Sequence, residues 1–295
     1  MGAVLNAVGS SDGSGGARTD ASQAVPRAGR RRIVRMGISR PLAGARRKIG
    51  RVSWRTVPAF IAGVLATLAA ALEVLCRGPA RADSAATDRI VRWWAAVWLH
   101  AAGARAVVRG LEHVRPGTVY VVVSNHQSNL DPMVHLRVLP PGLRVLAMRE
   151  LFRIWLLGPA MRAIGMIEVD RDSPDFGQID QAAARCLAAG HSLLVYPEGT
   201  TSPDGTIGEF KDGAFIIAIT SQAPVLPVTI DGTRRIWPPG RTAIHGGQVR
   251  VVIGNPLPTS GLTHDDVPRL RDQAHSVICA AHTAPDPAMQ AKTTP

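Results

Sequence analysis

The chain has 295 residues, enough for one large domain or two small ones, and its 46% hydrophobic content is ordinary for a globular protein. Lys and Arg number 34 against 22 Asp and Glu, which gives a formal net charge of +12. The three cysteines lie far apart without the spacing of metal ligands, which argues against a zinc site and fits buried thiols in a reducing compartment. They are Cys76, Cys186 and Cys279.

Most of the positive charge lies in residues 1–55, which hold twelve basic and two acidic residues and which we expect to form a basic, largely disordered arm. Such an arm can bind nucleic acid or an anionic membrane surface. No aromatic residue is interleaved with the arginines before Trp54, and the arm leads into an apolar segment. We therefore expect an anionic membrane surface, and no nucleic acid, as its partner. A solvated arm without a partner is the alternative, above all for residues 1–26, which are rich in Gly, Ser and Ala.

Residues 56–104 are expected to form a membrane-associating helical region. Their first segment, Thr56–Leu72, has no charged residue and is just shorter than the roughly 20 residues that a helix needs to span a bilayer. The sequence leaves open whether residues 56–76 span the membrane or lie on it. Arginines precede this segment densely, so its N-terminal side should stay in the cytoplasm. We expect a membrane location, with the domain that follows on the cytoplasmic side.

A second candidate helix, Thr87–Val107, contains three tryptophans within six residues, namely Trp93, Trp94 and Trp98. Tryptophan is favoured at a membrane–water interface, where its apolar ring lies next to a polar partner for its N–H. The same residues also fit the core side of an amphipathic helix. The sequence favours neither alternative.

From residue 105 to residue 282, short apolar runs rich in Val and Ile alternate with amphipathic stretches, and Gly, Pro or Asn separate them. This alternation predicts one α/β domain with a largely parallel central sheet flanked by helices. The expected strands are Ala106–Val108, Val119–Val123, Arg144–Ala147, Met166–Val169, Ser192–Tyr196, Val225–Ile230 and Gln248–Ile253. The expected helices are Pro132–Arg137, Leu151–Ile164, Phe176–Ala189, Asp212–Thr220 and Val267–His282. Residues 283–295 are expected to be a disordered tail.

The densest group of polar residues is Ser124–Pro132, which directly follows an expected strand. Sites in parallel sheets lie at the carboxyl ends of the strands. Pro132 suits the first turn of the next helix, so Asp131 can be its N-cap. The turn can also fold the Asp131 carboxylate back onto the His126 imidazole, which would fix one ring nitrogen as N–H and leave the other as a base for a hydroxyl. Taken alone, the spacing also fits a loop histidine beside a helix cap.

Two further expected strands end in charged residues. The strand Ser192–Tyr196 leads into Pro197-Glu198-Gly199-Thr200, an acid on a glycine-containing turn. The strand Met166–Val169 leads into Asp170-Arg171, and a guanidinium binds phosphate or carboxylate through two hydrogen bonds. Three strand ends therefore deliver a His–Asp pair, an arginine and a Glu-Gly-Thr turn to one edge. A surface salt bridge and a structural turn acid are the alternatives for the last two.

Four blocks of the chain, in order, resemble those of the glycerolipid acyltransferase family, which includes 1-acylglycerol-3-phosphate acyltransferases. The blocks are Asn125–Asp131, Gly165–Arg171, Tyr196–Ser202 with Phe210–Phe215 after it, and Val225–Ile230. Each block is modestly specific, but four in register are highly specific. The similarity extends from about Ala106 to Pro258.

The resemblance implies a role for each matching residue. His126 would be the general base, Asp131 would orient it, and Arg171 would contact the phosphate of the acceptor. The other residues expected to bind substrate are Glu198, Gly199, Thr200, Asn125 and Arg149. The resemblance also implies acyl-CoA or acyl carrier protein as donor, a lysolipid as acceptor, and neither cofactor nor metal. The expected reaction transfers a fatty acyl group to the free hydroxyl of 1-acylglycerol-3-phosphate, giving phosphatidic acid for phospholipid synthesis.

Two positions depart from the family pattern. Thr201 follows Glu-Gly-Thr where the family commonly has Arg, and Met148 stands before Arg149 where the family often has Lys. Both changes thin the positive charge expected around a phosphate, and one charged hydrogen bond contributes roughly 1.5–3 kcal/mol. Another lysolipid, such as a lyso-ornithine lipid, is therefore an alternative acceptor. A non-catalytic lipid-binding membrane protein is the alternative from a different class, and the intact His126 and Asp131 argue against it.

Overall fold

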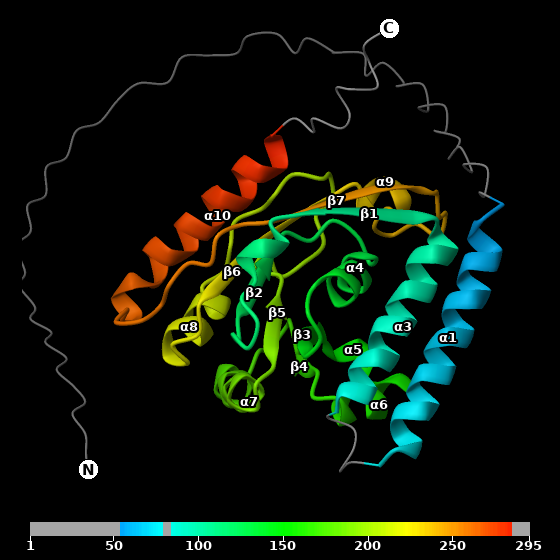
Figure 1. The fold of residues 1–295 in the computed structure, drawn as a ribbon, viewed down its shortest axis with the longest axis horizontal. Coiled ribbons are helices and arrows are strands. Elements are labelled where there is room, and N and C mark those ends of the chain that lie inside the picture. Colours follow the sequence, from blue (N-terminus) through cyan, green and yellow to red (C-terminus); the bar gives the residue numbers. More distant parts are fainter. Residues whose placement is uncertain (1–53, 79–83, 285–295) are drawn as a thin grey trace, which may run out of the picture. The chain divides into compact units, whose positions relative to one another are not determined.

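The computed structural model describes residues 54–78 and 84–284. Nearly all of the expected basic arm and most of the expected tail lie outside these residues, so both stay predictions. The described part consists of two long helices followed by a central β-sheet with helices on both faces (Figure 1). The predicted α/β class is therefore confirmed.

Within the described residues the sheet has seven strands in the order β1-β7-β6-β2-β5-β3-β4. All neighbouring pairs are parallel except β6 with β7, so the sheet is largely parallel, as predicted. The ends of the seven expected strands shift by at most two residues. The strands are β1 (Ala104–Arg109), β2 (Val121–Ser124), β3 (Leu143–Met148), β4 (Ile167–Val169), β5 (Ser192–Val195), β6 (Val225–Asp231) and β7 (Gly247–Ile253).

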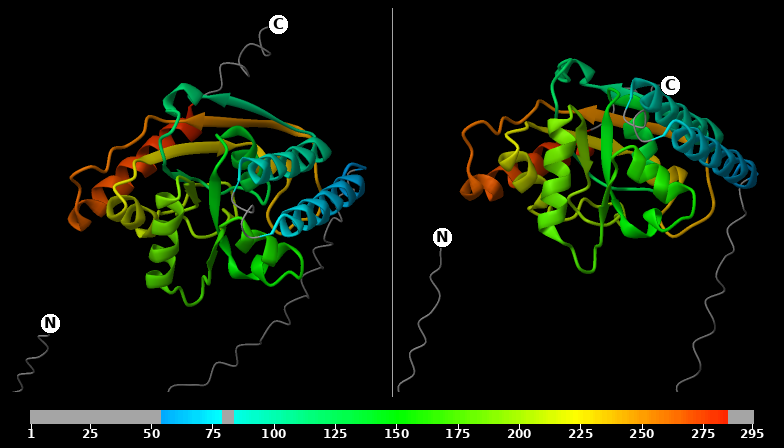
Figure 2. Two further views of the ribbon diagram at one scale, coloured as in Figure 1. Left: turned by 60° about the horizontal axis from the view of Figure 1, so that its bottom comes forward. Right: turned by 90° about the horizontal axis from the view of Figure 1, so that it is seen from below.

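Two layers of helices cover the sheet (Figures 1 and 2). One layer contains α7 (Phe176–Ala188), α8 (Gly213–Thr220) and α10 (Val267–Thr283), and the other contains α3 (Ala85–Ala102) and α4 (Asp131–Val138). Side chains alternate between the faces of a strand, so Val121 and Val123 of β2 join the core under the first layer and Val122 joins the other core. A strand buried on both faces explains the unbroken apolar run in the sequence.

The helix expected over Leu151–Ile164 is divided into α5 (Arg149–Phe152) and α6 (Leu157–Ala163). A turn separates the two helices, and Gly158 lies so close to Phe152 that a Cβ there would be 2.0 Å from the carbonyl oxygen. Pro159 has no N–H to donate, which suits the first turn of a new helix. The single long helix was therefore a wrong prediction.

The helix expected over Thr87–Val107 also ends earlier, because α3 stops at Ala102. Gly103 takes the left-handed conformation, with φ 68°, and caps the helix, and β1 begins at the next residue. Three short elements have no counterpart among the expected ones, since one helical turn gives little periodicity. They are α9 (Thr233–Ile236) and the 3₁₀ helices Leu111–His113 and His264–Asp266.

Among the described residues, α1 (Thr56–Cys76) is the one helix long and apolar enough to cross a membrane, judged by length and composition. Its most apolar 18-residue window has a mean hydropathy of 2.2, and 28% of that window is buried. The helix lies alongside α3 in all views (Figures 1 and 2) and turns its other face outward. The exposed apolar side chains of that face, here called the outer face of α1, are Val57, Ile61, Val64, Leu65, Leu68 and Leu72.

The three tryptophans of α3 divide between the two alternatives that the sequence left open. The N–H groups of Trp94 and Trp98 both donate to Thr67 Oγ1 of α1, at 2.8 and 3.2 Å. Gly63 makes room for this contact, because a Cβ there would lie 2.4 Å from the Trp98 ring. Trp98 is buried, whereas Trp93 is 49% exposed. Two of the rings therefore join α1 to α3, and the third faces outward.

Candidate active site

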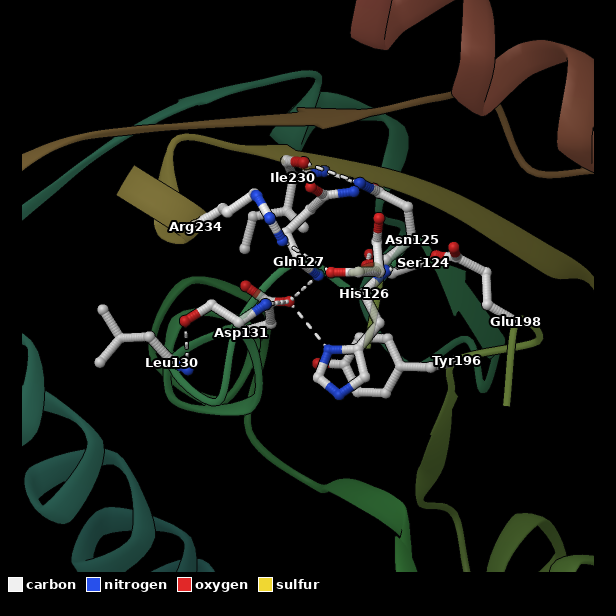
Figure 3. Close-up of polar contacts among 12 residues, drawn as sticks. Ser124, Asn125, His126, Gln127, Leu130, Asp131, Tyr196, Glu198, Ile230 and Arg234 are labelled. Atoms are coloured by element: carbon white, nitrogen blue, oxygen red, sulfur yellow. Dashed lines mark hydrogen bonds and ion pairs between the residues drawn. The ribbon is translucent and has the colours of Figure 1, made fainter. Parts of the chain in front are cut away.

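Asn125 fixes the loop between β2 and α4 to the neighbouring strand β6. Its Nδ2 donates to the carbonyl of Ile230 at 2.9 Å, and the Ile230 N–H donates to its Oδ1 at 2.8 Å (Figure 3). The Ser128 hydroxyl adds a second tie by donating to the carbonyl of Trp237 at 2.7 Å. Asn125 is fully buried and uses both ends of its amide in this way. Its contact with substrate stays a prediction.

The Asp131 carboxylate lies on the His126 imidazole, as the sequence predicted. Asp131 Oδ2 is 2.9 Å from His126 Nδ1 and also accepts the backbone N–H groups of Gln127 and Ser128, at 2.5 and 2.8 Å (Figure 3). An ionised carboxylate only accepts hydrogen bonds, so Nδ1 carries the hydrogen and Nε2 can act as a base. Asp131 is fully buried and His126 is 7% exposed. The pair is therefore enclosed and held in one tautomer.

Asp131 is not the N-cap of α4, which corrects the expectation drawn from Pro132. The N-cap is Leu130, Asp131 is the first helical residue, and Pro132 follows it in the first turn, as predicted. The carboxylate bonds the N–H groups of the preceding loop rather than those of its own helix. Its hydrogen bonds therefore hold the loop and the imidazole in place together.

Glu198, on the turn after β5, contacts the backbone of His126. Its Oε1 accepts the N–H of His126 at 2.7 Å, and its Oε2 accepts the N–H of Gly208 at 2.9 Å. Burial raises the pKa of the Glu198 carboxyl, and the two backbone hydrogen bonds oppose that shift. The structure thus joins the first and third sequence blocks. A contact between Glu198 and the acceptor stays a prediction.

Gly199, the second residue of the Glu-Gly-Thr turn, lies beside the Lys211 side chain. Gly199 has φ 72°, in the left-handed region that favours glycine, and a Cβ there would lie 2.8 Å from Lys211 Nζ. Thr200 is exposed, and its contact with substrate is untested. Lys211 therefore places a positive charge beside the turn where Thr201 replaces the arginine of the family pattern.

The two arginines expected at the acceptor lie at the ends of β3 and β4 and differ in their surroundings. Arg149 bonds Asp170 at 2.5 Å and lies 3.5 Å from Glu168. The hydrogen bond from the backbone N–H of Asp172 lowers the pKa of the Asp170 carboxyl most, and the Arg149 guanidinium lowers it next, so the carboxyl stays ionised. Arg171 is exposed and forms no ion pair with another described residue. Neither arginine contacts His126, so their roles toward substrate stay predictions.

Three further residues lie at the site but were not among the residues predicted from the sequence. The ring of Tyr196 stacks on the His126 imidazole, with centroids 4.1 Å apart (Figure 3). His135, one helical turn after Asp131, is fully buried behind the pair, and the spacing of four residues was the signal that could have identified it. Arg234 donates to the carbonyls of Ser202 and Pro203 and so supports the loop after the Glu-Gly-Thr turn.

No group of three or more His, Cys, Asp or Glu side chains within the described ranges is arranged to hold a metal ion. The arrangement supplies a base, its carboxylate partner and a nearby exposed cation. This set suits proton transfer from a hydroxyl on a substrate that carries an anionic group.

Comparison with known proteins adds independent support. Residues 105–231, a range that includes every predicted site residue, match the family described as Acyltransferase. Human 1-acyl-sn-glycerol-3-phosphate acyltransferase beta is 31% identical over 191 residues, which cover 64% of this chain and 69% of that protein. The chain belongs to the glycerolipid acyltransferase family. The resemblance of the four sequence blocks is thereby confirmed.

Two other members of the family extend the comparison. The human alpha protein is 36% identical over 179 residues, or 60% of this chain, and the chain spans 63% of its length. In the crystal structure of the 1-acyl-sn-glycerophosphate acyltransferase PlsC from Thermotoga maritima, the fold matches with a TM-score of 0.66 and 25% identity. That match covers 77% of this chain and 92% of the other.

Proposed function

We propose that this chain is an O-acyltransferase that moves a fatty acyl group from acyl-CoA or acyl carrier protein to the free hydroxyl of 1-acylglycerol-3-phosphate. The product is phosphatidic acid, the precursor for phospholipid synthesis. The buried His126–Asp131 pair at the carboxyl end of β2 is the observation that carries the proposal. The acceptor is supported by the relatives, whose names specify 1-acyl-sn-glycerol-3-phosphate.

In the proposed mechanism, His126 Nε2 takes the proton of the acceptor hydroxyl while the oxygen attacks the thioester carbonyl carbon. The C–S bond then breaks, and the leaving thiolate takes the proton from the imidazolium. Asp131 stabilises the imidazolium between the two proton transfers. The acceptor brings its own nucleophile and the thioester is already activated, so the proposed reaction requires neither a cofactor nor a metal.

Arg171 is the proposed contact for the acceptor phosphate, because its guanidinium is exposed at the strand-end edge. Arg149 is a weaker candidate, since Asp170 and Glu168 already neutralise it. This loss of free positive charge, together with Thr201, favours a second acceptor, a phosphate-free lysolipid such as a lyso-ornithine lipid. Lys211 beside the Glu-Gly-Thr turn weighs toward the phosphate.

The test is an acyl-transfer assay with the full chain in mixed micelles, using both donors and both acceptors at equal acyl chain length. We expect the higher kcat/KM with 1-acylglycerol-3-phosphate. A preference for the lyso-ornithine lipid would replace the acceptor and leave the reaction type standing. No transfer to either acceptor by a folded, vesicle-bound chain would favour the non-catalytic lipid-binding alternative and overturn the proposal.

We also propose that α1 and the basic arm attach the chain to an anionic membrane, with the catalytic domain on the cytoplasmic side. The outer face of α1 supplies the apolar contact. Each basic residue near an anionic surface adds about 1 kcal/mol.

Vesicle flotation with the double variant Leu65→Glu/Leu68→Glu tests the attachment without disturbing the contacts between α1 and α3. We expect the variant to lose most of its binding to vesicles that contain anionic lipid. Phe176→Glu on α7 is the matched control, since Phe176 is 64% exposed and lies outside α1. Equal flotation of the double variant and the control would contradict the proposed role of α1.

A further inference from the structure

The turn after β5 contacts the base at two places. The Tyr196 ring stacks on the His126 ring with centroids 4.1 Å apart and planes inclined by 17° (Figure 3). The Gly199 N–H donates to the Tyr196 carbonyl at 3.0 Å and closes the turn that also carries Glu198. One short turn therefore meets His126 at the face of its ring through Tyr196 and at its backbone N–H through Glu198.

His135 anchors Tyr196 from the core. Its Nδ1 lies 2.7 Å from the Asp131 carbonyl oxygen and 3.2 Å from Tyr196 Oη, and its Nε2 lies 3.0 Å from Ser124 Oγ. A carbonyl oxygen only accepts, so Nδ1 carries the hydrogen and shares it between the two oxygens. Burial lowers the pKa of His135 and favours its neutral form, while the Ser124 hydroxyl beside Nε2 donates to the Asn125 carbonyl at 3.1 Å. The Tyr196 hydroxyl is thus tied to the helix that carries Asp131.

The Tyr196 side chain presents a neutral, electron-rich ring face to the imidazole. Burial first, and the Asp131 charge second, raise the pKa of its hydroxyl well above the usual range, so it stays protonated. The face of an aromatic ring attracts a cation, and the attraction increases where water is excluded. His126 becomes a cation only after it accepts the proton, so the stack is stronger at that stage than in the resting enzyme.

We propose that Tyr196, anchored by His135, is a positioning residue for the base. It holds the plane of the His126 imidazole so that Nε2 meets the acceptor hydroxyl, and its ring face stabilises the imidazolium. The inference rests on the proposed function of His126 as general base. Asp131 bonds the edge of the ring and fixes the tautomer, but a contact at one edge leaves the plane of the ring some freedom to tilt. The stacked Tyr196 ring restricts that tilt.

Substitutions at Tyr196 separate the contribution of the ring face to kcat from the contributions of the hydroxyl and of side-chain volume. Tyr196→Leu removes the ring, and we expect kcat to fall about 10- to 30-fold with the KM of both substrates nearly unchanged. Tyr196→Phe keeps the ring and should restore kcat to within about threefold of wild type, because a neutral hydrogen bond contributes little. Pentafluorophenylalanine at position 196 keeps the shape but reverses the polarity of the face, so its kcat should resemble that of the leucine variant.

Two controls accompany the series. Tyr120→Phe removes the hydroxyl of the other tyrosine, which accepts the Arg115 N–H away from the site, and should leave kcat unchanged. The NMR signals of the His126 ring protons should carry a ring-current shift that the leucine variant loses and the phenylalanine variant retains. If the leucine variant does not fold, the pentafluorophenylalanine variant still tests the ring face.

The outcomes distinguish this inference from the proposed function. Wild-type kcat in the pentafluorophenylalanine variant, or a His126 ring-current shift that persists without Tyr196, would overturn the positioning role while acyl transfer stands. A wild-type chain that transfers no acyl group to any lysolipid, with the ring-current shift intact, would overturn the proposed function instead.

Discussion

The turns after β2 and β4 lie at the same edge of the sheet and are constructed in opposite ways. After β2, the polar groups are buried and bonded to one another, and Asp131 Oδ2 alone accepts three hydrogen bonds. After β4, the charged groups are accessible to solvent, and Asp170 holds the turn through backbone N–H groups. The Arg171 side chain at its tip is exposed.

Under the proposed function, this difference separates the turn that carries the chemistry from the turn that binds the acceptor. A base has to meet a hydroxyl within a few tenths of an ångström, which calls for rigid surroundings of buried, hydrogen-bonded groups. A charged head group can be bound by an exposed guanidinium that adjusts its side chain. Substitutions in the turn after β2 should therefore change kcat, and substitutions in the turn after β4 should change KM.

His126→Ala should have the largest effect on the turn after β2. Loss of the general base lowers the rate by roughly 10²–10⁴. The measurement is kcat in the acyl-transfer assay, with circular dichroism and vesicle binding as checks on the fold. His100→Ala, which removes an exposed histidine of α3, is the matched control and should keep full activity. Near-wild-type turnover by purified His126→Ala would exclude His126 as the base.

Asp131→Asn should have the next largest effect. The amide oxygen can take the place of Oδ2, and the NH₂ group can take that of Oδ1, which has no hydrogen-bond partner among the described residues. The variant therefore keeps the geometry and loses the negative charge beside the imidazolium. One charge-assisted hydrogen bond is worth roughly 1.5–3 kcal/mol, so kcat should fall about 10- to 100-fold while the acceptor KM changes little. A change in KM alone would make Asp131 a binding residue.

Arg171→Ala tests the turn after β4 and should act on KM. We expect the KM for 1-acylglycerol-3-phosphate to rise about tenfold, less than for a buried pair because water screens the exposed guanidinium. The KM for the acyl donor and kcat should stay nearly constant. Arg171→Lys should restore only part of the affinity, because an ammonium cannot bond the phosphate bidentately. Arg153→Ala removes another exposed arginine and serves as control. A fall in kcat at constant KM would contradict the division between the turns.

The sheet was predictable because each of its strands has a recognisable pattern in the local sequence. Val121, Val122 and Val123 form an apolar run, and polar residues follow it directly. Parallel strands bring their carboxyl ends to the same edge of the sheet. The contact between His126 and Asp131 was predictable because the two residues lie five positions apart, within one turn of the chain. The division of α5 from α6 did not, because the apolar pattern continues through it while the break depends on the close approach of Gly158 to Phe152.

Contacts between distant parts of the chain were the other limit. Nothing near Tyr196 in the sequence shows that its ring stacks on His126, seventy residues earlier in the chain. Glu198 carries a sequence signal, but its bond to the His126 N–H depends on the order of β2 and β5 in the sheet. The sequence therefore predicted His126, Asp131 and Glu198 as site residues, and the contacts that join them to one another and to Tyr196 required the fold.

The smallest expected effect concerns the contribution of His135, which is buried beside the His126–Asp131 pair, to the stability of the fold. Burial holds the pKa of His135 below its ordinary value of 6.5. Above pH 6.5 the imidazole is neutral in the folded and unfolded chain, so its contribution to stability is complete. As the pH falls below 6.5, the unfolded chain takes up the proton first, and the contribution declines until the pH reaches the folded-state pKa. The decline is at most about 1.4 kcal/mol per pH unit.

Thermal unfolding in detergent micelles between pH 7.5 and 5 measures this decline against His135→Gln, whose side chain does not titrate. The other titrating groups, including Glu198, are present in both proteins, so their effects on the difference largely cancel. We expect wild type to be the more stable protein at pH 7.5 and the difference to shrink toward pH 5. A constant difference would mean that His135 binds its proton equally in the folded and unfolded chain. The anchor of Tyr196 would then be charged below pH 6.5, and the turn after β2 would lose one of the buried, neutral, hydrogen-bonded groups that distinguish it from the turn after β4.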